Sequence, residues 1–231
     1  MPEPTNASLL PTTIRRSMVA GRFYLVFGGG FSIILAVTLS QTSVSGLTAG
    51  FPLLLPMFAT LGSLGALMVF VGDRTKGVFE YLIAYGIRPW SIFANTLLAA
   101  IVLTSLVMGT AWAAGVGISF ALGGVPPWDY EVVFLAYTIP VTFASAIFAT
   151  AIGCYWSSLS SPRAGINSPV GLAPLIGIAP AIFILILASV APPDRFLYVT
   201  GGAAAGLVAL VVILIALSGR LLKLERFLSP M

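Results

Sequence analysis

The sequence predicts an all-α polytopic membrane protein with six transmembrane helices. Of its 231 residues 58% are hydrophobic and 8% are charged, whereas a soluble domain carries about 25% charged residues. Six apolar stretches follow one another, each able to cross the membrane, because about 20 helical residues span a hydrocarbon core of about 30 Å. Alternating polar and apolar strands are absent from the sequence, which disfavours an outer-membrane barrel. The length leaves no room for a sizeable soluble domain.

Residues 1–22 are expected to form a cytoplasmic N-terminus that ends in a short helix. From Pro11 to Arg22 the arginines alternate with apolar residues such as Ile14 and Val19. That spacing predicts an amphipathic helix on the membrane surface, with its basic side toward anionic headgroups. A signal peptide is the alternative, but the apolar run Phe23–Leu39 is longer than the usual signal core and no small-residue cleavage site follows. We therefore expect an uncleaved first span.

Residues 23–219 form the predicted transmembrane domain. The six spans are expected at Phe23–Ser40, Pro52–Val71, Ser91–Leu122, Val132–Trp156, Pro169–Ala191 and Phe196–Gly219. The tail, residues 220–231, is expected to be cytoplasmic, and its part Arg220–Leu228 to lie along the membrane face.

Two further patterns concern the spans themselves. Small residues recur at four-residue steps in three spans, which predicts seams of close helix packing; they are Ser105, Gly109, Ala113, Gly117 and Ala121, then Ser145, Ala149 and Gly153, then Gly202 and Gly206. The predicted fifth span contains Pro169, Pro174 and Pro180, so it is either a static kinked helix or one that lines a pathway or moves.

Charge fixes the expected orientation. Ten of the eleven Lys and Arg residues lie in the N-terminus, the C-terminus and two loops, Gly72–Pro89 and Ser157–Ser168. The positive-inside rule places these segments in the cytoplasm. The same rule accounts for the basic character of the chain, so no nucleic-acid partner is expected.

The stretch Gly72–Leu98 is the longest polar interruption between spans. It opens with four charged residues, and Phe79, Leu82 and Ile83 then follow the i, i+3, i+4 spacing of a short amphipathic helix. Gly86 falls where a C-cap glycine belongs, and Pro89 suits the first turn of the next helix. Two interpretations remain open at this stage: a helix that presents a face to a partner, or an interfacial hairpin whose apolar side lies among the headgroups.

Several residue types are absent from the sequence. No Asp, Glu, Lys or Arg falls in the centre of a predicted span, which disfavours an ion-coupled transporter. No histidine is present, so His-based metal sites, His-ligated haem and Ser/His or Cys/His catalysis are excluded. Cys154 is the single cysteine, which rules out a disulfide framework. No Walker A motif is present.

The stretch from Asp73 to Ile83 reads DRTKGVFEYLI and resembles the coupling segment of type-2 ABC exporter permeases. The family pattern has an acidic-basic start, then Gly-Thr-hydrophobic-Glu-x-Leu-Leu, a short break and a long third span. The matching residues are Asp73, Arg74, Gly77, Glu80 and Leu82. The departures are Val78 for Thr, Asp73 for Glu, Gly86-Ile87 for a Pro-hydrophobic pair and Asn95 for a common Lys. With six spans and inside termini, the resemblance extends over nearly the whole chain.

The resemblance implies a function and a set of partners. Two permease subunits, a second copy of this chain or a homologous one, would sit in the membrane lipid on two ABC ATPase subunits. The chain would be no enzyme itself and bind no cofactor; ATP and Mg would be held by the partner ATPase. The segment 73–90 would couple the two, with Phe79 and Leu82 as buried anchors in a groove of the ATPase.

Other positions take their expected roles from the same resemblance. In the contact with the ATPase, polar interactions at the rim of the groove would come from Asp73, Arg74 and Glu80. The docked stretch would also include Val78 and Tyr81. Candidates for lining the transport pathway are Met57, Phe58, Leu61, Pro174 and Ile178. The missing charges favour a hydrophobic or amphipathic substrate. The alternatives are a haem or cytochrome-biogenesis ABC permease, a membrane anchor or assembly subunit that transports nothing, and a small secondary transporter.

Overall fold

The computed structural model describes residues 9–41, 54–122, 134–159, 179–180, 182–184, 186–187, 190 and 195–221. Within these ranges 95% of the residues are helical and none lies in a strand. The α-helices, in chain order, are α1 (Leu9–Ala20), α2 (Arg22–Gln41), α4 (Leu55–Thr60), α5 (Leu64–Thr75), α6 (Val78–Ala84), α7 (Pro89–Ala121), α9 (Ile139–Leu159) and α11 (Phe196–Leu221). A 3₁₀ turn, η3 (Leu61–Ser63), joins α4 to α5, and a π-helical turn, η4 (Phe134–Thr138), leads into α9.

Four helical stretches are long and apolar enough to cross a membrane: Arg22–Gln41, Leu55–Thr75, Pro89–Ala121 and Phe134–Ser157. They coincide with the first four predicted spans, and the chain is a multi-pass membrane protein of the all-α class. The apolar part of α11 described in full, Tyr198–Leu214, is shorter. Of the predicted fifth span, the structure describes residues 179–180, 182–184, 186–187 and 190, which are helical. The rest of that span, the loop 160–168 and most of the C-terminal tail lie outside the described residues.

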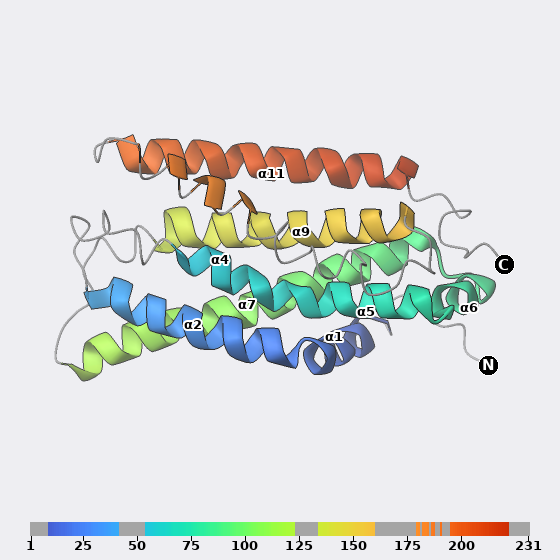
Figure 1. Cartoon of the computed structure of the whole chain (residues 1–231), viewed down its shortest axis with the longest axis horizontal. Coiled ribbons are helices and arrows are strands. Elements are labelled where there is room, and N and C mark those ends of the chain that lie inside the picture. Colours follow the sequence, from blue (N-terminus) through green and yellow to red (C-terminus); the bar gives the residue numbers. More distant parts are fainter. Residues whose placement is uncertain are drawn as a thin grey trace.

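The helices form one bundle with its long axis horizontal in Figure 1. α9 packs against α4, α5, α7 and α11, while α2 packs mainly against α7. Among the described residues the interior contains two large clusters along the bundle, and a small third one at Ala66, Ala99 and Ala100. One large cluster surrounds Leu35, Val107 and Tyr137, and the other surrounds Leu67, Phe79 and Phe93. α1, α6 and the C-terminal end of α11 lie at the same end of the bundle (Figure 1).

The second membrane-length helix, Leu55–Thr75, contains a 3₁₀ turn in its middle that the sequence did not predict. Gly62 lies against α7, where an added Cβ would come within 3.0 Å of the Val107 side chain. Thr60 and Ser63 donate their hydroxyls to the carbonyls of Pro56 and Thr60, at 2.6 and 2.8 Å. Such bonds from the side chain to the preceding turn often bend helices. This helix also ends at Thr75 rather than at the predicted Val71, so Asp73 lies within it.

The small residues of α9 form the predicted packing seam. Ser145, Ala149 and Gly153 are buried, and a Cβ on Gly153 would clash with Leu67 of α5 at 2.5 Å. The seams predicted in the third and sixth spans are not used among the described residues. The α7 stripe from Ser105 to Ala121 is exposed, and Gly109, Gly117, Gly202 and Gly206 have no neighbour within 4 Å of an added Cβ.

The closest helix crossing was not predicted and joins α1 to α5. A Cβ on Gly65 would lie 2.4 Å from the carbonyl oxygen of Ser17 and 3.1 Å from the Cα of Gly21. Only glycine allows the two backbones to approach this closely. The N-terminal helix, expected to lie on the membrane surface, is therefore packed onto the bundle, where it contacts both α5 and α7.

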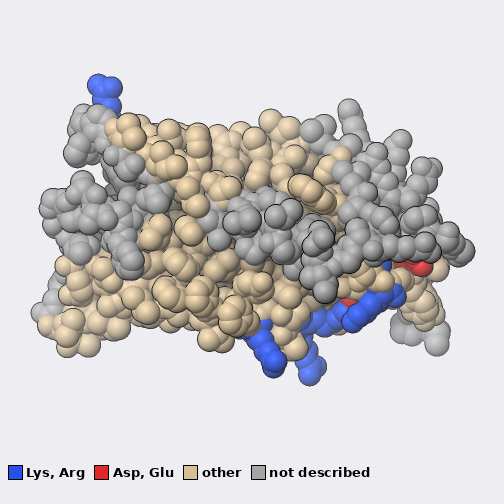
Figure 2. Space-filling model, viewed as in Figure 1, with Lys and Arg blue, Asp and Glu red and all other residues tan. Residues whose placement is uncertain are grey.

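The described charged side chains gather at the end of the bundle that holds α1, the end of α5 and α6. In Figure 2 most blue and red atoms lie along the lower edge from the middle to the right of the view, and the described surface to their left is mostly tan. Arg195, at the start of α11, is the described cation at the other end. This division between an uncharged body and charged ends is the one that a bilayer requires.

We predict that Gly65→Ala destabilises the protein by about 1–3 kcal/mol, because its new methyl group would overpack the crossing with α1. Thermal unfolding in detergent measures this loss, and faster trypsin cleavage at Arg15 and Arg16 would report the release of α1. The matched control is Gly109→Ala, which adds the same methyl group in open space and gains up to about 1 kcal/mol of helix propensity. Equal unfolding temperatures and equal cleavage rates in the two variants would contradict the close crossing of α1 and α5.

Candidate functional site

Two glycines in the left-handed conformation bracket α6. Gly77, between α5 and α6, has φ 72°, and Gly86, after α6, has φ 84°. The amides of Gly86 and Ile87 donate to the carbonyls of Ile83 and Leu82, at 2.9 and 3.1 Å. This is a Schellman motif, which ends a helix and buries the residue after the glycine. Ile87 is indeed buried, at 6% exposure.

The chain then turns into α7 as the sequence predicted. Arg88 is extended, with ψ 140°, and Pro89 takes the first helical position. Proline suits that position because its missing N–H would have no partner there and its φ is already helical. The short helix is therefore held between two glycines with positive φ, and a proline follows at the start of α7. These backbone conformations determine how α6 is oriented relative to α5 and α7.

The inner side of α6 packs into the chain itself. Phe79 is 2% exposed and meets Phe70 of α5 edge to face, with ring centroids 4.8 Å apart. Leu82 and Ile83 are partly buried against the same cluster. Phe79 was expected to anchor the segment in a partner's groove; in the structure its side chain packs into the chain's own core, and the contact with a partner stays a prediction. The periodicity correctly identified the apolar side, but that side is covered by the protein's own core.

The outer side of α6 carries two tyrosines. Tyr81 and Tyr85 are 63% and 54% exposed, their ring centroids are 4.7 Å apart, and their hydroxyl oxygens are 2.9 Å apart. The hydrogen bond to Tyr85 raises the pKa of Tyr81, so the Tyr81 phenol is neutral at physiological pH. Paired exposed tyrosines one helical turn apart form a rigid surface with an apolar body and polar tips. We call Tyr81 and Tyr85 the tyrosine face.

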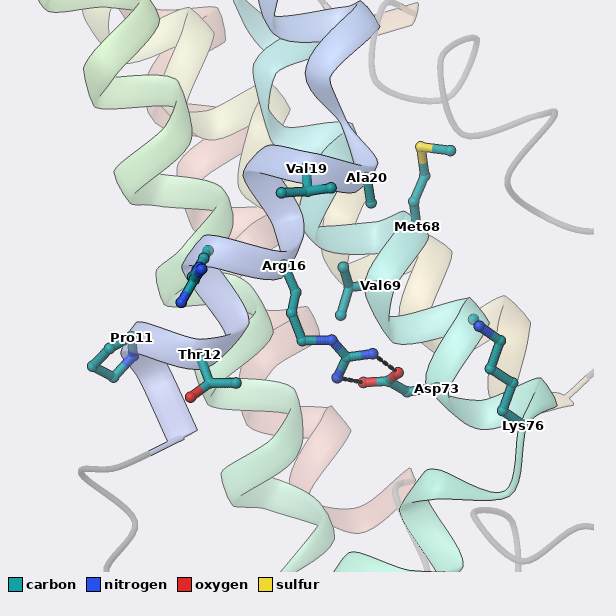
Figure 3. Close-up of a pocket in the computed structure, with 11 residues that line it drawn as sticks. Pro11, Thr12, Arg16, Val19, Ala20, Met68, Val69, Asp73 and Lys76 are labelled. Carbon is teal, nitrogen blue, oxygen red and sulfur yellow. Dashed lines mark hydrogen bonds and ion pairs between the residues drawn. The ribbon is translucent and has the colours of Figure 1, made fainter.

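An ion pair ties α5 to the N-terminal helix. Arg16 of α1 donates two parallel hydrogen bonds to the carboxylate of Asp73, with Nη1 at 2.7 Å from Oδ2. Figure 3 shows Arg16 reaching across to Asp73 below Val69. The Asp73 side chain is 9% exposed and that of Arg16 is 47% exposed. Bidentate pairs of this kind are stronger than single hydrogen bonds and hold a defined geometry.

Asp73 and Arg74 were expected to contact a partner at the rim of its groove, which stays a prediction, and both are largely buried within the chain. Asp73 is 6% exposed and Arg74 is 7% exposed. A side chain buried to this degree offers little surface to a partner. Val78 and Glu80 are half-buried, and the Glu80 carboxylate lies 3.4 Å from the position of a Cβ on Gly77.

The predicted pathway residues occupy different places. Met57 and Phe58 are half-buried against the interior cluster that includes Leu35, and the ring of Phe58 stacks on Phe31 at 4.8 Å. Leu61 is buried at 7% exposure. Pro174 and Ile178 lie outside the described residues. Phe58 thus contacts α2, and the role of these residues in a pathway stays a prediction.

The interior polar groups are mostly hydroxyls that bond to their own helices. Thr96, Thr142 and Thr150 each donate to the carbonyl four residues earlier, at 2.6–2.9 Å.

Among the described residues, no three His, Cys, Asp or Glu side chains lie together to hold a metal ion. Comparison of the chain with protein-family models, with curated proteins and with solved structures finds no match.

The ion pair predicts a specific pattern of stability changes. Arg16→Gln should cost about 1–2 kcal/mol of unfolding free energy, because it leaves the nearly buried Asp73 carboxylate without its cation. Arg16→Gln combined with Asp73→Asn should cost less than the sum of the single changes. Denaturant unfolding in neutral detergent measures all three variants. Arg15→Gln is the control, and an equal loss in this variant would show that the ion pair contributes nothing specific.

Proposed function

We propose that the chain is the transmembrane permease subunit of a type-2 ABC exporter, with six spans and both termini in the cytoplasm. The membrane would be the cell membrane, and a separate ATPase would supply the energy. The observation that carries the proposal is the placement of α6: a short helix, fixed between two membrane-length helices, at the charged end of the bundle. The resemblance of residues 73–83 to the family's coupling segment supports the same function.

The structure changes how the proposed contact is built. Phe79 and Leu82 hold α6 onto the bundle, so a push on α6 is transmitted to α5 through the contact between Phe79 and Phe70. The tyrosine face is then the surface that enters the groove of the ATPase. Tyrosine is enriched at the energetic centres of interfaces, because it buries a large area and keeps a polar tip.

The remaining parts of the proposal concern substrate and assembly. A second copy or a homologous permease would complete the pathway, as the resemblance to the family implies. The described interior is apolar with scattered hydroxyls, which favours a hydrophobic or amphipathic substrate. ATP and Mg would bind the ATPase alone.

The double change Tyr81→Ala, Tyr85→Ala tests the proposed contact. In complexes of the chain with the ABC ATPase subunits of its source organism, it should weaken association by about 2 kcal/mol or more, roughly thirtyfold. The protein alone should unfold at the parent's temperature, because both side chains are exposed. ATP hydrolysis in lipid and co-purification are the measurements.

Tyr198→Ala is the matched control, because Tyr198 is 82% exposed at the opposite end of the bundle. It should leave association and hydrolysis unchanged. Phe79→Ala is unsuitable for this test, because it removes interior packing. If the parent binds no ABC ATPase, or if the tyrosine variant couples as well as the parent, the proposal fails and a non-transporting anchor becomes the better account.

A further inference from the structure

A cleft lies between α1 and α5, beside the ion pair of Arg16 and Asp73. Its volume is about 690 Å³, within the range of about 300–1,000 Å³ that is typical of small-molecule sites. α1 contributes one side, including Arg15 and Val19, and α5 contributes the other, including Met68, with Lys76 at its end. Figure 3 shows Lys76 on the far side of Asp73 from Arg16.

The cleft carries excess positive charge. Arg15, Arg16 and Lys76 line it together with a single carboxylate, that of Asp73. Arg16 and Asp73 neutralise each other through their two hydrogen bonds. Arg15 and Lys76 are exposed and have no partner among the described residues. The site therefore offers two cations for an anion, held on either side of a neutral pair.

Part of the cleft wall is apolar and is formed by both helices. Val19 and Ala20 line it from α1, and Met68 and Val69 line it from α5. Val19 is 66% exposed, so apolar surface lies open directly beside the two cations. The membrane-length helix Leu55–Thr75 ends at this level, and headgroups are found where such helices end. A free inorganic anion would use the cations but leave the apolar wall uncovered.

We propose that this cleft binds the phosphate headgroup of one anionic phospholipid, with Arg15 and Lys76 pairing with the headgroup and an acyl chain covering Val19 and Met68. A lipid bound here contacts both α1 and α5 and strengthens the crossing at Gly65. The site is saturable, which distinguishes it from diffuse attraction of a basic helix to a charged surface. It is independent of the proposed ATPase partner.

Native mass spectrometry of the full chain in neutral detergent tests the site. Phosphatidylglycerol, phosphatidylcholine and inorganic phosphate are each titrated against the parent. The expected result is one tightly bound phosphatidylglycerol, with weaker binding of the other two probes. The double change Arg15→Gln, Lys76→Gln should reduce the affinity for phosphatidylglycerol by about tenfold or more, because it removes both cations that attract the anionic headgroup.

Two controls separate a built site from general charge. Arg22→Gln with Arg88→Gln removes the same charge from the same end of the bundle but outside the cleft, and should leave the affinity unchanged. Arg15→Lys with Lys76→Arg keeps both charges and should retain binding. An equal loss in both glutamine pairs, or equal binding of phosphatidylcholine, would overturn the proposal. Inorganic phosphate binding as tightly as phosphatidylglycerol would replace the lipid with a free anion and also overturn it.

Discussion

The ion pair between Arg16 and Asp73 holds the charged end of the bundle together. Asp73 lies in the last turn of a membrane-length helix, where an unpaired carboxylate would be costly, and Arg16 supplies the charge and both hydrogen bonds. The pair acts across a crossing that is already as close as two backbones can come, at Gly65. Because α5 leads directly through Gly77 into α6, the same contacts that clamp α1 also determine where α6 lies. The N-terminal helix is thus part of the site.

Local rules predicted the elements well, but they could not predict which surfaces meet. Hydropathy placed the first four membrane-length helices, and turn chemistry placed Gly86 and Pro89, because both depend on neighbouring residues. The pairing of Arg16 with Asp73 joins residues 57 positions apart, and no local pattern encodes it. Periodicity assigned Phe79 to an apolar side without indicating whether the chain or a partner covers that side. The small residues of α7 share a spacing with those of α9, yet only the latter are packed, since spacing identifies a possible seam and not its neighbour.

Two surfaces of different chemistry lie at the same end of the bundle. The cleft with Arg15 and Lys76 lies between α1 and the end of α5, and the tyrosine face lies on α6, a few residues after Lys76. In the account proposed here, a lipid steadies α1 against α5, while an ATPase acts on α6. Both effects meet at the turn that contains Gly77.

The central claim is that α6 presents Tyr81 and Tyr85 to the cytoplasm while Phe79 is held inside. Its most direct test is labelling with a membrane-impermeant maleimide in sealed vesicles of each orientation. The background is Cys154→Ala, which removes the single, buried cysteine, and single cysteines are then placed at positions 79, 81 and 85. The account predicts rapid labelling at 81 and 85 in inside-out vesicles only, and slow labelling at 79. Equal rates at 79 and 81, or labelling at 81 from the outer face, would contradict it.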